Sequence, residues 1–189
     1  MTEREKAALG LHYLPADEEL SRQRLRASEL CYDYNHLRPS QTEERALVLA
    51  QLLGCVDASA TIVPPFHCDY GYNVELGANF YANTGCVMLD CAPIRIGNNV
   101  LLAPNVGLYT ALHPMDAETR NTGLEYAAPI TIGDNVWLCA GVQILPGVTI
   151  GRNTVVGAGS VVHKDLPEGV LAIGNPCRVI RPIETSDRS

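Results

Sequence analysis

The chain has 189 residues, of which 47% are hydrophobic and 6% aromatic, and a formal net charge of −7 at pH 7. This length suits one domain with at most a small appendage, and its core must be built from Val, Ile, Leu and Ala. The charge disfavours nucleic acid or an anionic membrane surface as a partner.

No apolar run in the sequence is long enough for a membrane span or a signal-peptide core, so we expect a cytoplasmic protein. The seven cysteines have no regular spacing and no CxxC motif, so we expect reduced thiols and no structural zinc site.

Residues 1–56 are predicted to form a helical segment. The run from Asp17 to Leu37 contains no Gly or Pro, which favours one long helix. A second helix is expected to begin at Thr42, and Gly54 is its expected C-cap.

A six-residue repeat dominates the second half of the chain. Apolar residues recur at Ile132, Leu138, Ile144, Ile150, Val156 and Val162, and a second small or apolar series falls at Val136, Val142, Val148, Thr154 and Ser160. A period of six fits neither an α-helix nor a simple strand alternation. It predicts a chain that turns a corner every six residues and stacks as a parallel β-helix.

The same spacing is visible earlier, with one interruption. Leu76, Ala82 and Met88 are six residues apart, as are Ile96, Leu102 and Leu108. The stretch 109–129 lacks the repeat and is predicted to be a long excursion loop, which in a compact domain is usually functional. We therefore expect a β-helix domain over 57–183 and a short tail over 184–189.

Several segments together resemble the maltose O-acetyltransferases within the hexapeptide-repeat acyltransferases, with the galactoside O-acetyltransferases next. They are ADEELSRQRLRASEL, CDYGYNVELGANFYAN, LDCAPIRIGNNVLLAPNV, TALHPMDAETRN, PITIGDNVW and GNPCRVIR. The resemblance implies a left-handed β-helix, a homotrimer with sites between subunits, acetyl-CoA as co-substrate and no required metal.

His113 in the excursion loop is the candidate catalytic base. Its imidazole can accept a proton near neutral pH, and acetylation of a hydroxyl needs such a base. The alternative is an ordinary solvent-exposed loop histidine. The resemblance matches His113 to the catalytic histidine of the family, and it matches Ala140 to the residue whose N–H faces the thioester oxyanion.

The resemblance also implies an acceptor-binding set. It places Asn83 and Tyr81 at the acceptor, together with Asp17, Arg26 and Tyr72, the last being serine in the galactoside-type enzymes. From their chemistry alone, Asp69 and Glu125 could orient a sugar hydroxyl or the imidazole. The alternative for Asn83 and Tyr81 is turn chemistry, and for Asp17 and Arg26 it is an ordinary solvated charge on a helix.

The C-terminal end of the repeat region is the expected coenzyme A site. Lys164, Arg178 and Arg181 supply cations that suit phosphates, although a solvated surface is the simpler explanation. The small Ala158 would let the cofactor arm approach the backbone closely. By resemblance, Trp137 lines the site, and His163 stands where the family often has threonine.

The expected function is therefore direct acetyl transfer from acetyl-CoA to a hydroxyl of a sugar such as maltose or glucose. Galactoside-type and chloramphenicol-type acetyltransferases are the alternatives within the class. A carbonic-anhydrase-like enzyme would need three histidine ligands, and a non-catalytic hexapeptide scaffold is a third class. Covalent catalysis by Cys139 is disfavoured, because nothing near it in sequence marks a lowered thiol pKa.

Overall fold

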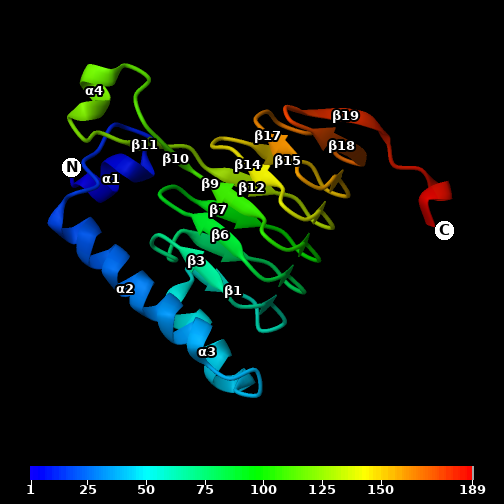
Figure 1. The fold of residues 1–189 in the computed structure, drawn as a ribbon, viewed down its shortest axis with the longest axis horizontal. Helices are drawn as coiled ribbons and strands as arrows, with labels where there is room; N and C mark the ends of the chain where they lie inside the picture. The colour runs from blue at the N-terminus through cyan, green and yellow to red at the C-terminus, as the bar shows by residue number, and fades with distance from the viewer. Residues whose placement is uncertain (189) are drawn as a thin grey trace.

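The structure is a computed structural model that describes residues 1–188, in which a helical segment leans against a prism-shaped coil of short strands (Figure 1). The segment contains α1 (Glu3–Ala8), α2 (Glu18–His36) and α3 (Thr42–Leu52). Thr2 caps α1 through a reciprocal capping box with Glu5. The segment thus holds one helix more than the sequence predicted, the additional one being the short α1.

The prediction of Gly54 as the C-cap of α3 is wrong. The helix ends at Leu52, its C-cap is Leu53 in an extended conformation, and Gly54 does not adopt a positive φ. A Cβ atom on Gly54 would lie 2.2 Å from the carbonyl oxygen of Tyr72. Glycine is needed there because two backbone segments approach closely.

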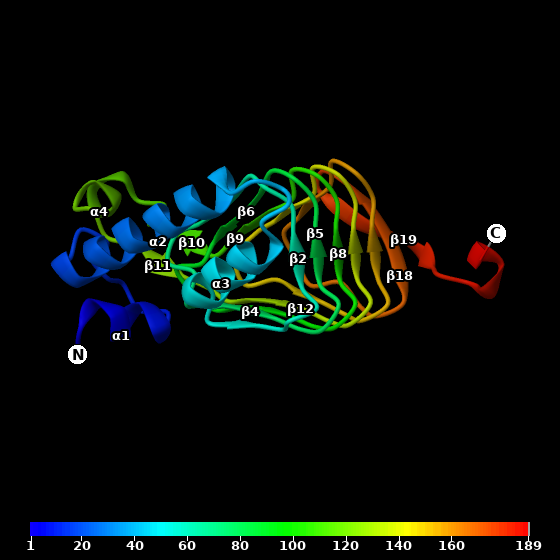
Figure 2. The same cartoon turned by 90° about the horizontal axis from the view of Figure 1, so that it is seen from below.

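Three sheets, parallel except for the β18–β19 pair, form the sides of the prism, and Figure 2 shows β2, β5 and β8 of one of them side by side. The first sheet contains β1 (Cys55–Val56), β4 (Val74–Leu76), β7 (Ile94–Ile96), β12 (Ile130–Ile132) and β15 (Thr149–Ile150). The second contains β2 (Thr61–Ile62), β5 (Tyr81–Ala82), β8 (Leu101–Leu102), β13 (Trp137–Leu138), β16 (Val155–Val156), β18 (Val170–Gly174) and β19 (Cys177–Pro182). The third contains β3 (Phe66–Cys68), β6 (Cys86–Leu89), β9 (Gly107–Tyr109), β14 (Gln143–Ile144) and β17 (Val161–Val162).

The six-residue repeat marks the interior of this coil. Equivalent positions stack directly: Ile132 pairs with Ile96 below it and with Ile150 above it. Both predicted series are buried, none of their members being more than 2% exposed: Ile132, Leu138, Ile144, Ile150, Val156, Val162, Val136, Val142, Val148, Thr154 and Ser160. The predicted fold class, a left-handed parallel β-helix with a helical N-terminal segment and an excursion loop, is confirmed.

An asparagine ladder stabilises one corner of the prism. Asn79, Asn99, Asn135 and Asn153 have φ of 55–58°, in the left-handed region that asparagine tolerates better than most residues. Each side-chain amide donates to the next one along the stack, at 2.9–3.1 Å. The repeated turn conformation is thereby held by bonds that run between successive coils.

The excursion leaves the coil after β9 and returns at β12. It contains the antiparallel pair β10 (Ala111–Leu112) and β11 (Tyr126–Ala127) with α4 (Ala117–Asn121) between them. Both views place the loop beside α1 and the start of α2 (Figures 1 and 2). At the other end, the chain closes with a 3₁₀ turn, η1 (Thr185–Arg188), after the β18–β19 hairpin. In the described part of the chain, no helix has the length and apolar character needed to cross a membrane.

Candidate active site

His113 and Glu125 face each other at the base of the excursion. The antiparallel register pairs Leu112 with Tyr126. His113 follows Leu112 and Glu125 precedes Tyr126, so the register places these two side chains opposite each other. His113 Nε2 lies 3.7 Å from Glu125 Oε1, and the histidine side chain is 56% exposed against 19% for the glutamate. The imidazole thus meets solvent on one side and a largely shielded carboxylate on the other.

Tyr13 fixes Glu125 in place. Its hydroxyl donates to Glu125 Oε2 at 3.0 Å, and the two residues also exchange backbone hydrogen bonds of 2.9 and 3.0 Å. Tyr13 is 1% exposed, and burial is the largest cause of the strong rise in its pKa, so its hydroxyl stays protonated and donates. The glutamate therefore reaches His113 from a rigid, bonded position.

A cleft of about 470 Å³ opens beside His113. Its wall combines groups from α2, the 69–70 turn and the excursion. The lining residues are Pro15, Ala16, Arg24, Asp69, Tyr70, Leu89, Cys91, Ala111, His113 and Glu125. Two carboxylates, a guanidinium and an imidazole in one cleft suit a small polyhydroxylated ligand.

Arg24 is the cation of this cleft, and the sequence analysis missed it. One of its terminal nitrogens donates to the Tyr70 hydroxyl at 2.6 Å, and the other to the Pro15 carbonyl oxygen at 2.6 Å. A signal was present in the helical periodicity. Arg24 shares a face with Leu20 and Ala27, which are both buried on α2.

Neither Asp17 nor Arg26 is among the residues that line this cleft in the single chain. Asp17 caps α2, where its carboxylate accepts from the backbone N–H groups of Glu19 and Leu20. Arg26 is exposed two positions from Arg24, on another face of the helix, and donates to the Gln51 carbonyl oxygen at 2.9 Å. The side chain that the structure brings to His113 is therefore Arg24.

A buried carboxylate supports the 69–73 turn. Asp90 is 0% exposed and accepts from the backbone N–H groups of Asp69, Tyr70 and Asn73. Burial raises its pKa to about 6 despite these bonds. Asp90 thus holds the turn that presents Asp69 to the cleft.

Asp69 and Cys91 form a close polar pair on the cleft wall. The thiol donates to Asp69 Oδ2 at 3.4 Å. Burial raises the pKa of Asp69, and it raises that of the Cys91 thiol to about 12. Cys91 therefore stays protonated and serves as a donor to the carboxylate.

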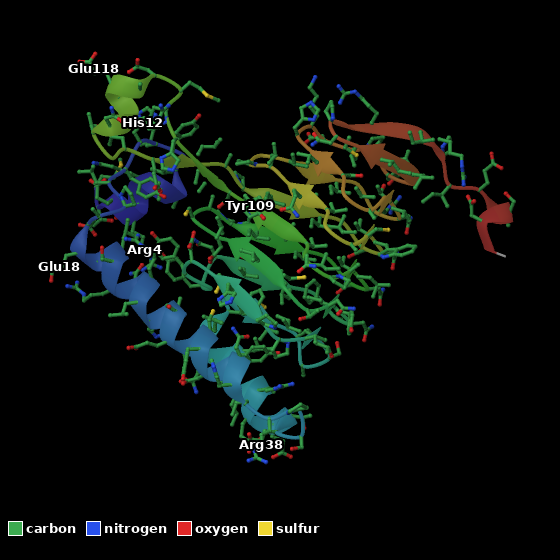
Figure 3. All side chains as sticks on the ribbon, in the orientation of Figure 1. Arg4, His12, Glu18, Arg38, Tyr109 and Glu118 are labelled. Carbon is green, nitrogen blue, oxygen red and sulfur yellow. The ribbon has the colours of Figure 1, made fainter. Side chains whose placement is uncertain are left out.

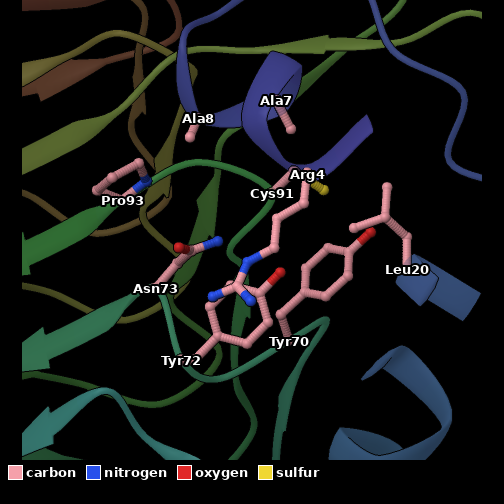
Figure 4. Close-up of a pocket in the computed structure, with 9 residues that line it drawn as sticks. All are labelled: Arg4, Ala7, Ala8, Leu20, Tyr70, Tyr72, Asn73, Cys91 and Pro93. Atoms are coloured by element: carbon pink, nitrogen blue, oxygen red, sulfur yellow. The ribbon is translucent and has the colours of Figure 1, made fainter. Parts of the chain in front are cut away.

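Tyr72, which is expected at the acceptor, lies outside this cleft in the single chain. Its hydroxyl donates to Gln23 Oε1 at 2.8 Å, and the Arg4 guanidinium lies 4.6 Å from the centre of its ring. Figure 4 shows both residues in a smaller pocket of about 130 Å³, between α1 and the coil. Arg4 reaches that pocket from α1, as the all-side-chain view also shows (Figure 3). Tyr70 and Cys91 line both pockets and form the wall between them.

A second group of predicted residues occupies the corner between the second and third sheets. Asn83 follows β5, Ala140 follows β13, and Ala158 follows β16. The N–H groups of Cys139 and Gly141 both donate within the coil, whereas that of Ala140 donates to no carbonyl in the described residues. The exposed Ala140 thus presents a free backbone donor to solvent.

Tyr81 and Trp137 lie on the outer face just before this corner. Each pairs with Leu101, from opposite sides, so the three form one outward row across the second sheet. Trp137 is 48% exposed. This row makes an apolar wall beside the free N–H of Ala140.

These two groups of residues do not meet within one chain. Asn83 lies before the N-terminal end of β6, whereas His113 lies beyond the C-terminal end of β9, the parallel neighbour of β6. Successive strand residues advance about 3.3 Å, so the length of these strands separates the two side chains.

The basic residues at the C-terminal end are only partly free. Arg178 is exposed, but Arg181 forms a bidentate ion pair with Asp187, with both distances 2.7 Å. His163 and Lys164 follow β17, and His163 Nδ1 is buried with no hydrogen-bond partner among residues 1–188. In the same range, no three His, Cys, Asp or Glu side chains are grouped so that they could hold a metal ion.

Comparison with known proteins gives the class and then the family. Residues 6–57 match the maltose acetyltransferase hexapeptide capping motif, and residues 129–164 match the six-repeat bacterial transferase hexapeptide. A putative acetyltransferase of Saccharomyces cerevisiae is 52% identical over 171 residues, which cover 90% of this chain and 87% of that protein.

Two solved structures have the same fold over nearly their whole length. A maltose O-acetyltransferase from Clostridium difficile 630 superposes with a TM-score of 0.96 at 50% identity, covering 97% of this chain and 98% of that one. A galactoside acetyltransferase in complex with coenzyme A also reaches a TM-score of 0.96, at 44% identity, covering 100% and 94%.

The fold and the matched motifs define a hexapeptide-repeat acyltransferase. More narrowly, the chain belongs to the galactoside and maltose O-acetyltransferase family and is an acetyltransferase enzyme.

Proposed function

We propose that this enzyme transfers the acetyl group of acetyl-CoA directly to a hydroxyl of a small sugar, with His113 as the general base. The arrangement that supports this most is the His113–Glu125–Tyr13 series at the edge of a polar cleft. Coenzyme A is bound in the solved structure of the galactoside acetyltransferase, to which this chain is 44% identical.

The cleft supplies the acceptor chemistry. Asp69 and Glu125 can accept from sugar hydroxyls, and Arg24 can donate to them. A largely aromatic acceptor such as chloramphenicol offers these charged groups fewer hydroxyls than a sugar does. The chemistry of the wall therefore favours maltose, glucose or a galactoside over the xenobiotic alternative.

In the reaction, the imidazole of His113 accepts the proton of the acceptor hydroxyl while its oxygen attacks the thioester carbonyl carbon. Glu125, beside the ring, stabilises the imidazolium that forms. The free N–H of Ala140 is suited to donate to the oxyanion of the tetrahedral intermediate. Collapse of this intermediate breaks the C–S bond, and the imidazolium protonates the departing thiolate of coenzyme A.

The complete site requires two neighbouring copies, and we propose a homotrimer. In a closed ring, the edge that carries His113 in one subunit can face the corner that carries Asn83 and Ala140 in the next. Lys164, Arg178 and Arg181 are the cations available for the coenzyme A phosphates, with Ala158, Trp137 and His163 beside the same path. We expect the enzyme to act in the cytoplasm, where acetyl-CoA is made.

Two inactive variants test this proposal together. His113→Ala should lower kcat by about 10²–10⁴-fold and leave coenzyme A affinity unchanged in calorimetry. Equal amounts of His113→Ala and Asn83→Ala subunits, mixed and allowed to exchange, should regain activity, because about a quarter of the boundaries join two intact residues. Near-normal turnover in His113→Ala would reject the base, and no recovery after proven exchange would reject the shared site.

A further inference from the structure

We propose that Cys31 and Cys68 form an oxidisable dithiol, which peroxides or disulfide oxidants convert into a disulfide between α2 and β3. Their sulfur atoms lie 3.7 Å apart. Cys31 lies on the buried face of α2, and Cys68 is the last residue of β3, facing that helix. Neither thiol takes part in the proposed transfer reaction, and the two are 37 positions apart in the chain.

The backbone around the pair is already held at a fixed distance. Asn35, one helical turn after Cys31, donates from Nδ2 to the Phe66 carbonyl oxygen and accepts from the Phe66 N–H, both at 2.9 Å. Phe66 lies two residues before Cys68, and side chains two apart on a strand share a face. These two hydrogen bonds thus clamp the helix to the strand beside the thiols.

Disulfide formation needs only a small movement within this clamp. A disulfide S–S bond is about 2.05 Å long, so the sulfurs must approach by about 1.7 Å in total. Rotation of both side chains about their Cα–Cβ bonds can share that distance. Cys68 is partly accessible although Cys31 is 2% exposed, so a small oxidant has a way in.

Hydrogen peroxide can accept the two electrons that the two thiols lose when they form a disulfide. The hydrogen bond between the two thiols lowers the pKa of Cys31, which favours the nucleophilic thiolate. This thiolate attacks one peroxide oxygen; the O–O bond breaks, and proton uptake leaves a sulfenic acid and water. The Cys68 sulfur then attacks the sulfenic sulfur, and a second water leaves. In sum, two thiols and one hydrogen peroxide give one disulfide and two waters.

The crosslink would join the two elements that carry the acceptor cleft. Cys68 is followed directly by Asp69, and Arg24 lies on the same helix as Cys31, so the disulfide constrains both cleft residues. We therefore expect oxidation to change the KM for the acceptor, and this expectation rests on the proposed function, in which the acceptor is a sugar. The disulfide itself does not depend on what the enzyme acetylates.

The test uses the full-length enzyme, fully reduced and then treated with stoichiometric hydrogen peroxide or oxidised glutathione. Non-reducing digestion with trypsin and chymotrypsin, followed by mass spectrometry, should show a Cys31–Cys68 crosslink with the loss of two hydrogens. The oxidised protein should melt about 4 °C or more above the reduced protein. Cys31→Ser and Cys68→Ser should each lose the crosslink and the thermal gain. The matched control Cys55→Ser, at an exposed cysteine, should keep both.

Acceptor kinetics provide a second measurement. Oxidation should change the acceptor KM at least about twofold in the wild type and leave that of Cys31→Ser unchanged. If no acceptor sugar is turned over, the proposed function fails while the crosslink and the thermal gain still support the dithiol. Failure of the crosslink to form with either oxidant, after exposed Cys55 has reacted, would overturn the dithiol. So would a crosslink to another cysteine or an unchanged melting temperature in oxidised wild type.

Discussion

Tyr13 and Glu125 are 112 positions apart and joined by three hydrogen bonds, two between their backbones and one from the tyrosine hydroxyl to the carboxylate. Through this pair, the N-terminal segment holds the strand of the excursion that faces His113. The position of Glu125 beside the candidate base therefore depends on a contact between the helical segment and the loop.

Removing this support should weaken catalysis without abolishing it. Tyr13→Phe keeps the buried ring but loses the hydroxyl bond, so we expect kcat to fall by up to about 10-fold. Glu125→Gln should cost more, because the imidazolium loses its counter-charge. Steady-state kinetics with Tyr32→Phe, at an exposed tyrosine, as the control would check this. Equal rates for Tyr13→Phe and wild type would show that Glu125 needs no support from the tyrosine.

Arg24 and Arg26 form a matched pair on one helix. Arg24→Ala should raise the acceptor KM about 10–100-fold, as expected for a charge-assisted hydrogen bond to a ligand. Arg26→Ala, at an exposed arginine outside the cleft, should change it by less than about twofold. Circular dichroism would establish that both variants are folded. A larger effect from Arg26→Ala than from Arg24→Ala would show that Arg26, as expected from the sequence, contacts the acceptor.

The interior of the coil predicts unequal costs for neighbouring residues. Ile150 is 1% exposed and Thr149 is exposed, although both belong to β15. Ile150→Ala should lower the free energy of unfolding by about 2–5 kcal/mol, because it leaves a cavity in a packed stack. Thr149→Ala should change it by about 0.5 kcal/mol or less. Thermal or denaturant unfolding of both variants measures the difference, and equal shifts would contradict the assigned register.

Asp90 predicts a pH dependence of stability. Its native pKa of about 6 lies above the ordinary 3.8, so on acidification the native state binds the proton before the unfolded state does. The unfavourable contribution of the buried charge is therefore largest above pH 6 and is relieved as the pH falls toward about 4. The shift corresponds to about 3 kcal/mol.

Asp90→Asn isolates this contribution. The free energy of unfolding of the variant minus that of the wild type should be larger at pH 7.5 than at pH 4.5, whatever the absolute stability of the variant. Urea unfolding at both pH values measures this change. A difference between the two proteins that is independent of pH would show that Asp90 does not titrate in this range.

The tail tests the expected coenzyme A site. Asp187 holds Arg181, and this ion pair lowers the pKa of the aspartate to about 2, so it is charged at neutral pH. Asp187→Ala should lower the KM for acetyl-CoA by up to about fivefold if Arg181 then turns to a phosphate. Arg178→Ala and Arg181→Ala should raise the KM for acetyl-CoA and leave the KM for the sugar almost unchanged. Identical affinities for coenzyme A and dephospho-CoA in wild type and all three variants would place the phosphates elsewhere.

The six-residue period was enough to predict the coil. The spacing of Ile132, Ile144 and Ile150 suits a chain that buries these side chains in its interior, and turn residues such as Asn135 and Asn153 repeat along one corner. The sequence also predicted that the excursion would interrupt the repeat and carry His113. These features depend on short-range spacing, which a single sequence displays directly.

Which polar side chains meet depends on how the elements pack in three dimensions. Arg24 and Arg26 are both arginines on the same helix, and the packing of α2 against the coil turns one into the cleft and leaves the other in solvent. Likewise, the contacts of Glu125 with Tyr13 and of Cys31 with Cys68 join residues far apart in the chain. Spacing along the chain carries no record of such contacts, because they are set by how the helical segment and the excursion dock on the finished coil.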